Sequence, residues 1–226
     1  MVRALVQEMR LLLDVVTSPR EAVRSFAAHA PVGAVLAILG TLQAVVVAIQ
    51  GWLLQPAVLG DPLLADTAGS EAVLGRYWMA RGAAMVLGPA MSVLRGAALA
   101  TLLQGCAALA GATLRWRALL SLSLHLDVVF WLENLCVTVL LALRRPAALA
   151  DLEALRLHAG LDLVWHPQSA RLAAFLEAAN LFTAWWAILV GVALVAWMRG
   201  RRRLAATTAG SLWIGLVVLR MVTTVR

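Results

Sequence analysis

Residues 32–54 read VGAVLAILGTLQAVVVAIQGWLL, a stretch without a single charged side chain. An α-helix needs about 20 consecutive apolar residues to cross the roughly 30 Å hydrocarbon core of a bilayer. Trp52 lies near the far end of this stretch, where an indole ring favours the membrane interface. The segment therefore predicts a transmembrane helix, and it decides how the rest of the chain is interpreted.

The composition supports the same interpretation for most of the chain. Of its 226 residues, 62% are hydrophobic and 14% are charged, against about 45–50% and about 25% in soluble domains. We predict an all-α, polytopic membrane protein with five transmembrane helices in residues 32–226. The four further apolar runs are residues 82–111, 118–143, 172–198 and 204–225.

The first 31 residues form a separate cytoplasmic or interfacial segment in this prediction. Apolar side chains recur at helical spacing along residues 1–17, and polar side chains fall opposite them. Such an amphipathic helix is expected to lie along the membrane surface. It is not a signal peptide, because Glu8, Arg10 and Asp14 interrupt the apolar stretch that one requires. Ser18 and Pro19 predict the start of a second, short helix that ends by Pro31.

The connections between the predicted spans are polar. Residues 55–81 carry Pro56, Gly60 and Asp61-Pro62, which predicts a loop in water. In the second apolar run, Gly88-Pro89 predicts a kink or a re-entrant turn. A longer polar connection extends from Arg144 to Arg171.

The charge distribution indicates an orientation. All 19 cationic residues are arginines and the formal net charge is +7. A nucleic-acid partner is not expected, because the arginines lie singly or in short groups beside apolar runs. The connections at 113–117 and 199–203 are rich in arginine and free of acidic residues, so the positive-inside rule makes them cytoplasmic. We expect a cell (inner) membrane protein with a cytoplasmic N-terminus and an external C-terminus.

Several of these features together resemble a known family. They are the amphipathic start, the sequence SPREA at residues 18–22, five closely set spans, the connection at 111–117, and NLFTAW at residues 180–185. This pattern, over residues 18–226, is similar to the prokaryotic branch of the Yip (Ypt/Rab-GTPase-interacting protein) membrane family. The resemblance implies a five-helix membrane protein whose eukaryotic relatives associate with prenylated small GTPases. GTPase binding is not carried over, because this chain has only a short cytoplasmic head.

Arginine inside an apolar run needs a partner or water, since an unpaired one at mid-membrane costs about 2.5–3.5 kcal/mol on insertion scales. Arg95 lies well inside the second run, and Asp127 and Glu133 lie on the third. Counted from the connection between the two runs, Arg95 and Glu133 reach similar depth, so we predict that they pair. Either this ion pair fixes helix register, or the three residues line a polar relay or substrate path.

A second polar group is predicted near the outer interface. Glu177 and Asn180 share one helix face at the start of the fourth run. They either line an outward-facing polar pocket or form an interfacial hydrogen bond that holds the preceding connection to the bundle.

No pattern of residues indicates catalysis. The sequence contains none of the glycine-rich phosphate loops, zinc-binding histidine pairs or nucleophile elbows that mark enzymes. His158, Asp162 and His166 recur every four residues, but Gly160 and Pro167 disfavour the helix that would align them. We therefore expect no enzyme activity, cofactor or metal. The expected partners are the lipid bilayer and a second membrane protein or another copy of the chain. An accessory or scaffolding role is favoured, and a small transporter or permease-like subunit is the alternative.

Overall fold

The computed structural model describes residues 2–28, 32–60, 70–109, 111–144, 169, 172, 175–176, 178–197 and 202–224. All regular secondary structure in these residues is α-helical. The helices are α1 (Val2–Thr17), α2 (Pro19–Ala28), α3 (Val32–Leu59), α5 (Ser70–Leu109), α6 (Trp116–Leu126), α7 (Val128–Arg144), α10 (Leu181–Trp197) and α11 (Arg202–Thr224).

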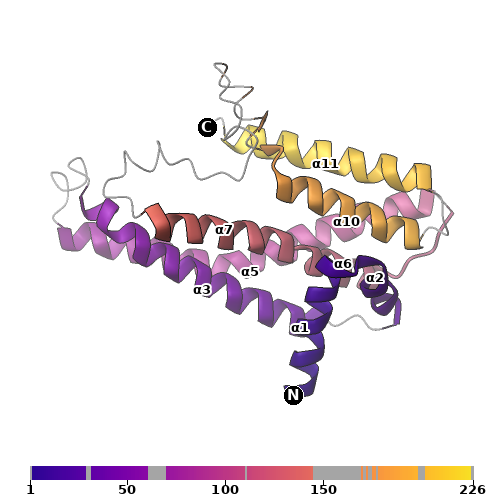
Figure 1. The fold of residues 1–226 in the computed structure, drawn as a ribbon, viewed down its shortest axis with the longest axis horizontal. Coiled ribbons are helices and arrows are strands. Elements are labelled where there is room, and N and C mark those ends of the chain that lie inside the picture. The colour runs from indigo at the N-terminus through magenta and orange to yellow at the C-terminus, as the bar shows by residue number, and fades with distance from the viewer. Residues whose placement is uncertain are drawn as a thin grey trace.

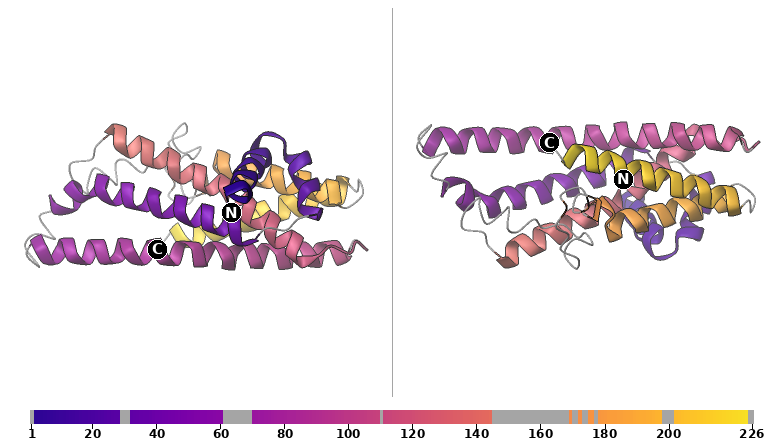
Figure 2. Two further views of the ribbon diagram at one scale, coloured as in Figure 1. Left: turned by 90° about the horizontal axis from the view of Figure 1, so that it is seen from below. Right: turned by 90° about the horizontal axis from the view of Figure 1, so that it is seen from above.

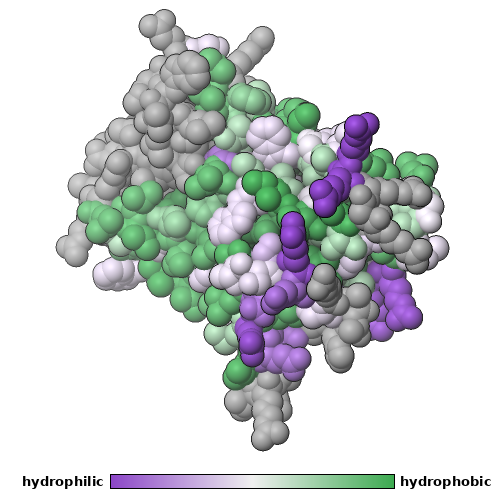
Figure 3. Space-filling view, turned by 45° about the vertical axis from the view of Figure 1, so that its right-hand side comes forward, coloured by the Kyte–Doolittle hydropathy of each residue, from purple (hydrophilic) through white to green (hydrophobic). Residues whose placement is uncertain are grey.

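Most helices lie roughly along one axis. Helix α5 extends through the long dimension of the molecule, α3 packs on both α5 and α7, and α10 and α11 form an antiparallel pair along the other half (Figure 1). Helix α1 crosses this bundle at a steep angle. The two views in Figure 2 show α5 as the longest helix of the bundle. Hydrophobic side chains cover much of the described surface in Figure 3.

The predicted membrane character is present in the structure. Four helical stretches are long and apolar enough to cross a bilayer: Val32–Leu59, Glu71–Leu109, Trp116–Leu143 and Arg202–Val222. Helix α10 is also apolar but has only 17 residues, the lower end of the usual range for a spanning helix. The chain is thus an all-helical protein with four clear candidate spans.

Two helices are longer than predicted. Helix α3 continues through Pro56 to Leu59, and α5 begins at Ser70, so much of the loop predicted at 55–81 is helical. Pro56 has no N–H to donate to the Trp52 carbonyl oxygen, and α3 ends within a turn of it, where the Gly60 N–H is donated to the Pro56 carbonyl oxygen at 2.9 Å. Helix α5 also runs unbroken through Pro89, which excludes the re-entrant alternative.

The core is centred on α6. Every residue from Leu119 to Leu126 is buried, because α1 and α2 cover the side of α6 that α3, α5 and α10 leave open. Leu12 and Val15 of α1 and Ala22 and Val23 of α2 belong to the same buried cluster as these leucines. Segments 1–31 and 32–226 therefore share one hydrophobic core.

Close helix approach in this core depends on Gly96 of α5. A Cβ atom placed there would lie 3.0 Å from Leu124 Cδ2 on α6. Leu124 is fully buried, so it has little freedom to move aside. Small residues at helix contacts permit this kind of packing in membrane proteins.

The substitution Gly96→Val is expected to destabilise the bundle by about 1–3 kcal/mol, the usual cost of overpacking a close-packed core. Gly105→Val is the matched control, because it lies on the same helix and a Cβ there would meet nothing within 4 Å. Thermal unfolding in detergent should show a lower Tm for Gly96→Val than for Gly105→Val. Equal Tm values would contradict this account of the α5–α6 contact.

Candidate functional site: a charged network inside the bundle

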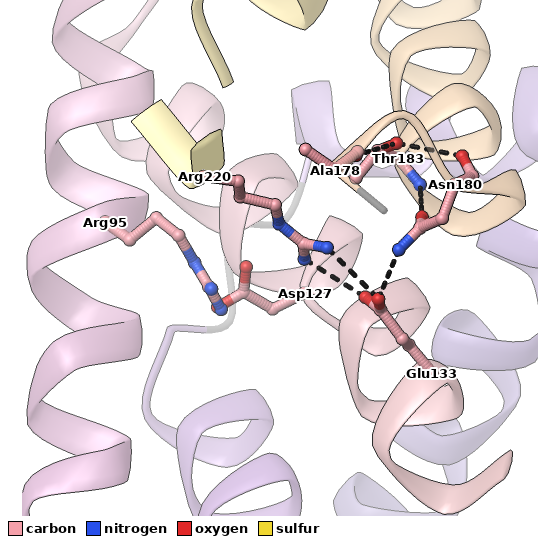
Figure 4. Close-up of polar contacts among 7 residues, drawn as sticks. All are labelled: Arg95, Asp127, Glu133, Ala178, Asn180, Thr183 and Arg220. Carbon is pink, nitrogen blue, oxygen red and sulfur yellow. Dashed lines mark hydrogen bonds and ion pairs between the residues drawn. The ribbon is translucent and has the colours of Figure 1, made fainter. Parts of the chain in front are cut away.

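The first ion pair of the network joins α5 to the junction between α6 and α7. Arg95 Nη2 lies 2.9 Å from Asp127 Oδ2, and 7% of the Asp127 side chain is exposed against 48% of Arg95. Figure 4 shows the two side chains pointing toward one another. The carboxylate thus meets the guanidinium at the wall of the bundle rather than at its centre.

A local change in helix geometry places Asp127. Its N–H is donated to the Leu124 carbonyl oxygen at 3.2 Å, three residues back, where a regular α-helix would use the fourth. The α-helical pattern resumes at once, because the Trp131 N–H bonds to the Asp127 carbonyl oxygen at 3.0 Å. The third apolar run is therefore divided into α6 and α7 at Asp127, the first of its two acidic residues.

The second ion pair is bidentate. Arg220 of α11 donates from Nη1 to Glu133 Oε1 and from Nη2 to Glu133 Oε2, both at 3.1 Å. Asn180 adds a third donor, since its Nδ2 bonds to Glu133 Oε1. The end of α11 and the start of α10 thus converge on one carboxylate of α7 (Figure 4).

Asn180 also begins α10. Leu172, Phe175, Leu176 and Ala178 are helical, and regular helix is interrupted at Ala179 and Asn180. The Asn180 side-chain oxygen then accepts the Thr183 N–H at 2.8 Å, as an N-cap residue does. The positive end of the α10 dipole faces the Glu133 carboxylate, which is the favourable arrangement for an anion.

Phe130 lies between the two ion pairs. The Cζ atoms of Arg95 and Arg220 are 4.8 Å and 5.2 Å from the centre of its ring, within the range of cation–π attraction. The network therefore contains two arginines and two carboxylates, with an aromatic ring that both cations contact. Its formal charge is zero.

The predicted pair of Arg95 with Glu133 is wrong, because Arg95 pairs with Asp127. The count along the sequence that favoured Glu133 did not consider which face of the helix each carboxylate occupies. Glu133 lies six positions after Asp127, and on a regular helix this spacing places the two side chains about 120° apart around the axis. Asp127 therefore faces α5, whereas Glu133 faces α10 and α11.

Asn180 was predicted in a separate site at the outer interface, and the structure brings it into contact with Glu133. Glu177, its predicted companion, lies outside the described residues. Arg220 was not proposed as a site residue. It could have been found from the sequence, because Asn180 and Arg220 each lie roughly 20 residues from the connection at 199–203. Two antiparallel helices joined by that connection bring such positions to a similar height along the bundle.

A cavity of about 160 Å³ adjoins the first ion pair. At about 30 Å³ per water molecule this volume would hold roughly five waters. Polar groups from α3, α5 and α7 line it, and Trp131 Nε1 is buried without a hydrogen-bond partner among the described residues. The polar lining residues are Gln43, Ser92, Arg95, Asp127, Trp131 and Asn134.

A further buried polar contact attaches α1 to α6. Glu8 Oε2 lies 3.4 Å from His125 Nε2, and His125 Nδ1 is 2.7 Å from the Ser121 carbonyl oxygen. His125 is fully buried. Glu8, predicted on the polar face of an interfacial helix, is instead buried against the bundle.

Within the described part of the chain, no group of three or more His, Cys, Asp or Glu side chains could hold a metal ion. His158, Asp162 and His166 lie outside that part. Comparison with known proteins gives no relative: no family model matches the chain, no curated protein matches its sequence, and no solved structure matches its fold.

The pairing of Arg95 with Asp127 can be tested by a double-mutant cycle. Arg95→Leu and Asp127→Leu each leave one charge without its partner, whereas the double variant leaves none. We expect the double variant to be more stable than the sum of the single effects predicts, with a coupling of about 1 kcal/mol or more in thermal unfolding. In the matched cycle of Arg95→Leu with Glu133→Leu, the effects of the two substitutions on the free energy of unfolding should be nearly additive. Strong coupling to Glu133 instead would contradict the observed geometry.

Proposed function

We propose that this chain is an accessory or scaffolding protein of the cell (inner) membrane, which acts through protein partners or through the organisation of the bilayer and carries no enzyme activity. The observation that supports it best is the pairing within the charged network. Arg95 meets Asp127 at 2.9 Å and Arg220 meets Glu133 at 3.1 Å, so each charge in the network already has a protein partner. Such a network is suited to fixing helix register.

The proposed topology has five spans, with α10 as the short one. The helical residues Leu172, Phe175, Leu176 and Ala178 lie before the break and would extend its crossing. The α5–α6 connection lies at the same end of the bundle as the start of α11 (Figure 1). Arg115, Arg117, Arg202 and Arg203 therefore share that end, which supports a cytoplasmic assignment by the positive-inside rule. The N-terminus is then cytoplasmic and the C-terminus external.

An interfacial position of α1 is supported by the distribution of its side chains over three faces. Leu12 and Val15 pack against the bundle, whereas Val6, Met9 and Leu13 are exposed. Gln7, Arg10 and Thr17 form a third face that is polar and exposed. A helix with one face on protein, one apolar face and one polar face suits the boundary between lipid and water.

Membership of the prokaryotic branch of the Yip family is part of the proposal. It rests on the sequence pattern at 18–22 and 180–185, and on the helical, membrane-like character of the chain. Asn180, the first residue of the second motif, is the N-cap of α10 and a ligand of Glu133. The motif thus occupies a position with a structural role.

Two observations favour a small transporter subunit as the second candidate. The cavity of about 160 Å³ beside Arg95 and Asp127 has a polar lining, and α10 is interrupted beside Glu133. Interrupted helices whose ends face charged groups form the substrate sites of many transporters. A polar path would then use Arg95, Asp127 and Glu133.

Reconstitution into liposomes separates the two candidates. An accessory protein should leave an imposed pH gradient or potassium gradient to decay at the rate of protein-free liposomes. A faster decay that Asp127→Asn abolishes would favour the transporter and overturn the accessory role. Arg117→Gln, which changes an exposed residue in the first turn of α6, is the control for unspecific leakage.

The exposed apolar face of α1 should hold the helix against lipid. Replacing Val6, Met9 and Leu13 by Ser removes this face, and each such side chain contributes about 1.5–3 kcal/mol when fully buried. We expect faster amide hydrogen exchange in α1 for the full chain in lipid nanodiscs. The control variant, Gln7→Ala with Thr17→Ala, changes the polar face instead. Its α1 amides should exchange at the wild-type rate. Unchanged exchange in the Ser variant would mean that lipid does not contact this face.

A further inference from the structure

A groove of about 640 Å³ lies where α2 meets the α10–α11 pair. Helix α2 is fixed there, because Trp197 Nε1 of α10 bonds to the Val23 carbonyl oxygen at 3.3 Å. The groove is apolar along α10 and α11 and basic at its α2 end. Its lining consists of Arg20, Ile188, Gly191, Val192, Val195, Ala196, Arg202 and Ala206.

Small side chains produce the hollow. Gly191 packs closely on α11, since a Cβ there would lie 3.5 Å from Ala209 Cβ. Ala196 and Ala206 extend only a methyl group each from the two helices. The apolar part from Ile188 to Ala196 is about 12 Å long at 1.5 Å per residue, so the groove presents an elongated apolar channel.

The two arginines at the groove are available to bind an anion. Arg20 and Arg202 are both exposed, and neither forms an ion pair with any acidic residue that the structure describes. Among the residues that the structure describes, no acidic side chain lines the groove. Each arginine lies in the first turn of its helix, where the helix dipole also favours negative charge.

We propose that this groove binds one anionic phospholipid. Its phosphate lies between Arg20 and Arg202, and an acyl chain occupies the apolar channel along Val192 and Val195. A lipid matches both halves of the groove, whereas a soluble anion would leave the apolar channel empty. Basic pockets between transmembrane helices on the cytoplasmic side are typical sites for anionic headgroups. The proposal requires only that the chain lies in a membrane, and it is independent of the accessory role.

Native mass spectrometry of the full-length protein in detergent tests the site. Phosphatidylglycerol and phosphatidylcholine with identical acyl chains serve as the anionic and zwitterionic probes. We expect one phosphatidylglycerol to be retained in preference to phosphatidylcholine. The variant Arg20→Gln with Arg202→Gln should bind phosphatidylglycerol about tenfold more weakly or worse, since each cation near an anionic headgroup contributes to binding.

The matched control is Arg115→Gln with Arg117→Gln, which removes the same charge from exposed positions at the same end of the bundle. It should bind like the wild type. An equal loss of phosphatidylglycerol binding in both double variants would overturn the proposal. Wild-type binding by Arg20→Gln with Arg202→Gln would overturn it as well. Equal retention of phosphatidylcholine would also overturn it.

A second variant tests the apolar half of the groove without removing charge. Ala206→Trp should fill the channel and weaken phosphatidylglycerol binding while both arginines remain. Glycerol phosphate, the headgroup without chains, should not compete at concentrations where the lipid binds. Wild-type binding by Ala206→Trp, or full competition by glycerol phosphate, would show an anion site without a lipid site. If Arg20→Gln with Arg202→Gln fails to elute as a folded protein, phosphatidylglycerol binding by Ala206→Trp alone tests the proposed lipid site.

Discussion

The structure depends on the neutralisation of charge inside the bundle. A carboxylate in low dielectric is expensive unless an opposite charge and additional hydrogen bonds satisfy it. Glu133 receives two guanidinium donors from Arg220 and an amide donor from Asn180. Because these donors come from α11 and from the start of α10, this one side chain determines how the C-terminal helix pair packs on α7.

The interruptions in the helices follow from the same constraint. A backbone N–H or carbonyl without a partner costs several kcal/mol in hydrocarbon, so a helix can be interrupted there only where other groups replace its hydrogen bonds. Asn180 does this with its own side chain, which accepts the Thr183 N–H and still donates to Glu133. At Asp127 the helix tightens for one turn instead. Both irregularities coincide with polar residues of the network, which indicates that positioning the charges outweighs the regularity of the helices.

The sequence predicted the long apolar helices of the chain better than the pairings between their polar side chains. Uninterrupted apolar runs such as 32–54 carry a strong signal, because spanning length and hydrophobicity are properties of one segment. The choice between Asp127 and Glu133 as the partner of Arg95 depends on the rotation of two helices about their axes, which counting depth does not provide. The burial of Glu8 against His125 could not be predicted for a related reason. The sequence of an amphipathic helix does not indicate whether one polar side chain faces protein or water.

The burial of α6 explains why the N-terminal helices belong to the bundle. Two of its polar side chains are satisfied within α6, since Ser123 Oγ bonds to the Leu119 carbonyl oxygen at 2.8 Å and His125 Nδ1 contacts that of Ser121. The other ring nitrogen of His125, Nε2, points from α6 toward α1, where Glu8 Oε2 lies 3.4 Å away. Glu8 supplies the missing polar partner, and Leu12 and Val15 beside it cover the neighbouring leucines. Helix α1 therefore covers His125 of α6 with protein, and its remaining faces, which carry Val6, Met9 and Leu13 on one side and Gln7 and Arg10 on the other, stay exposed.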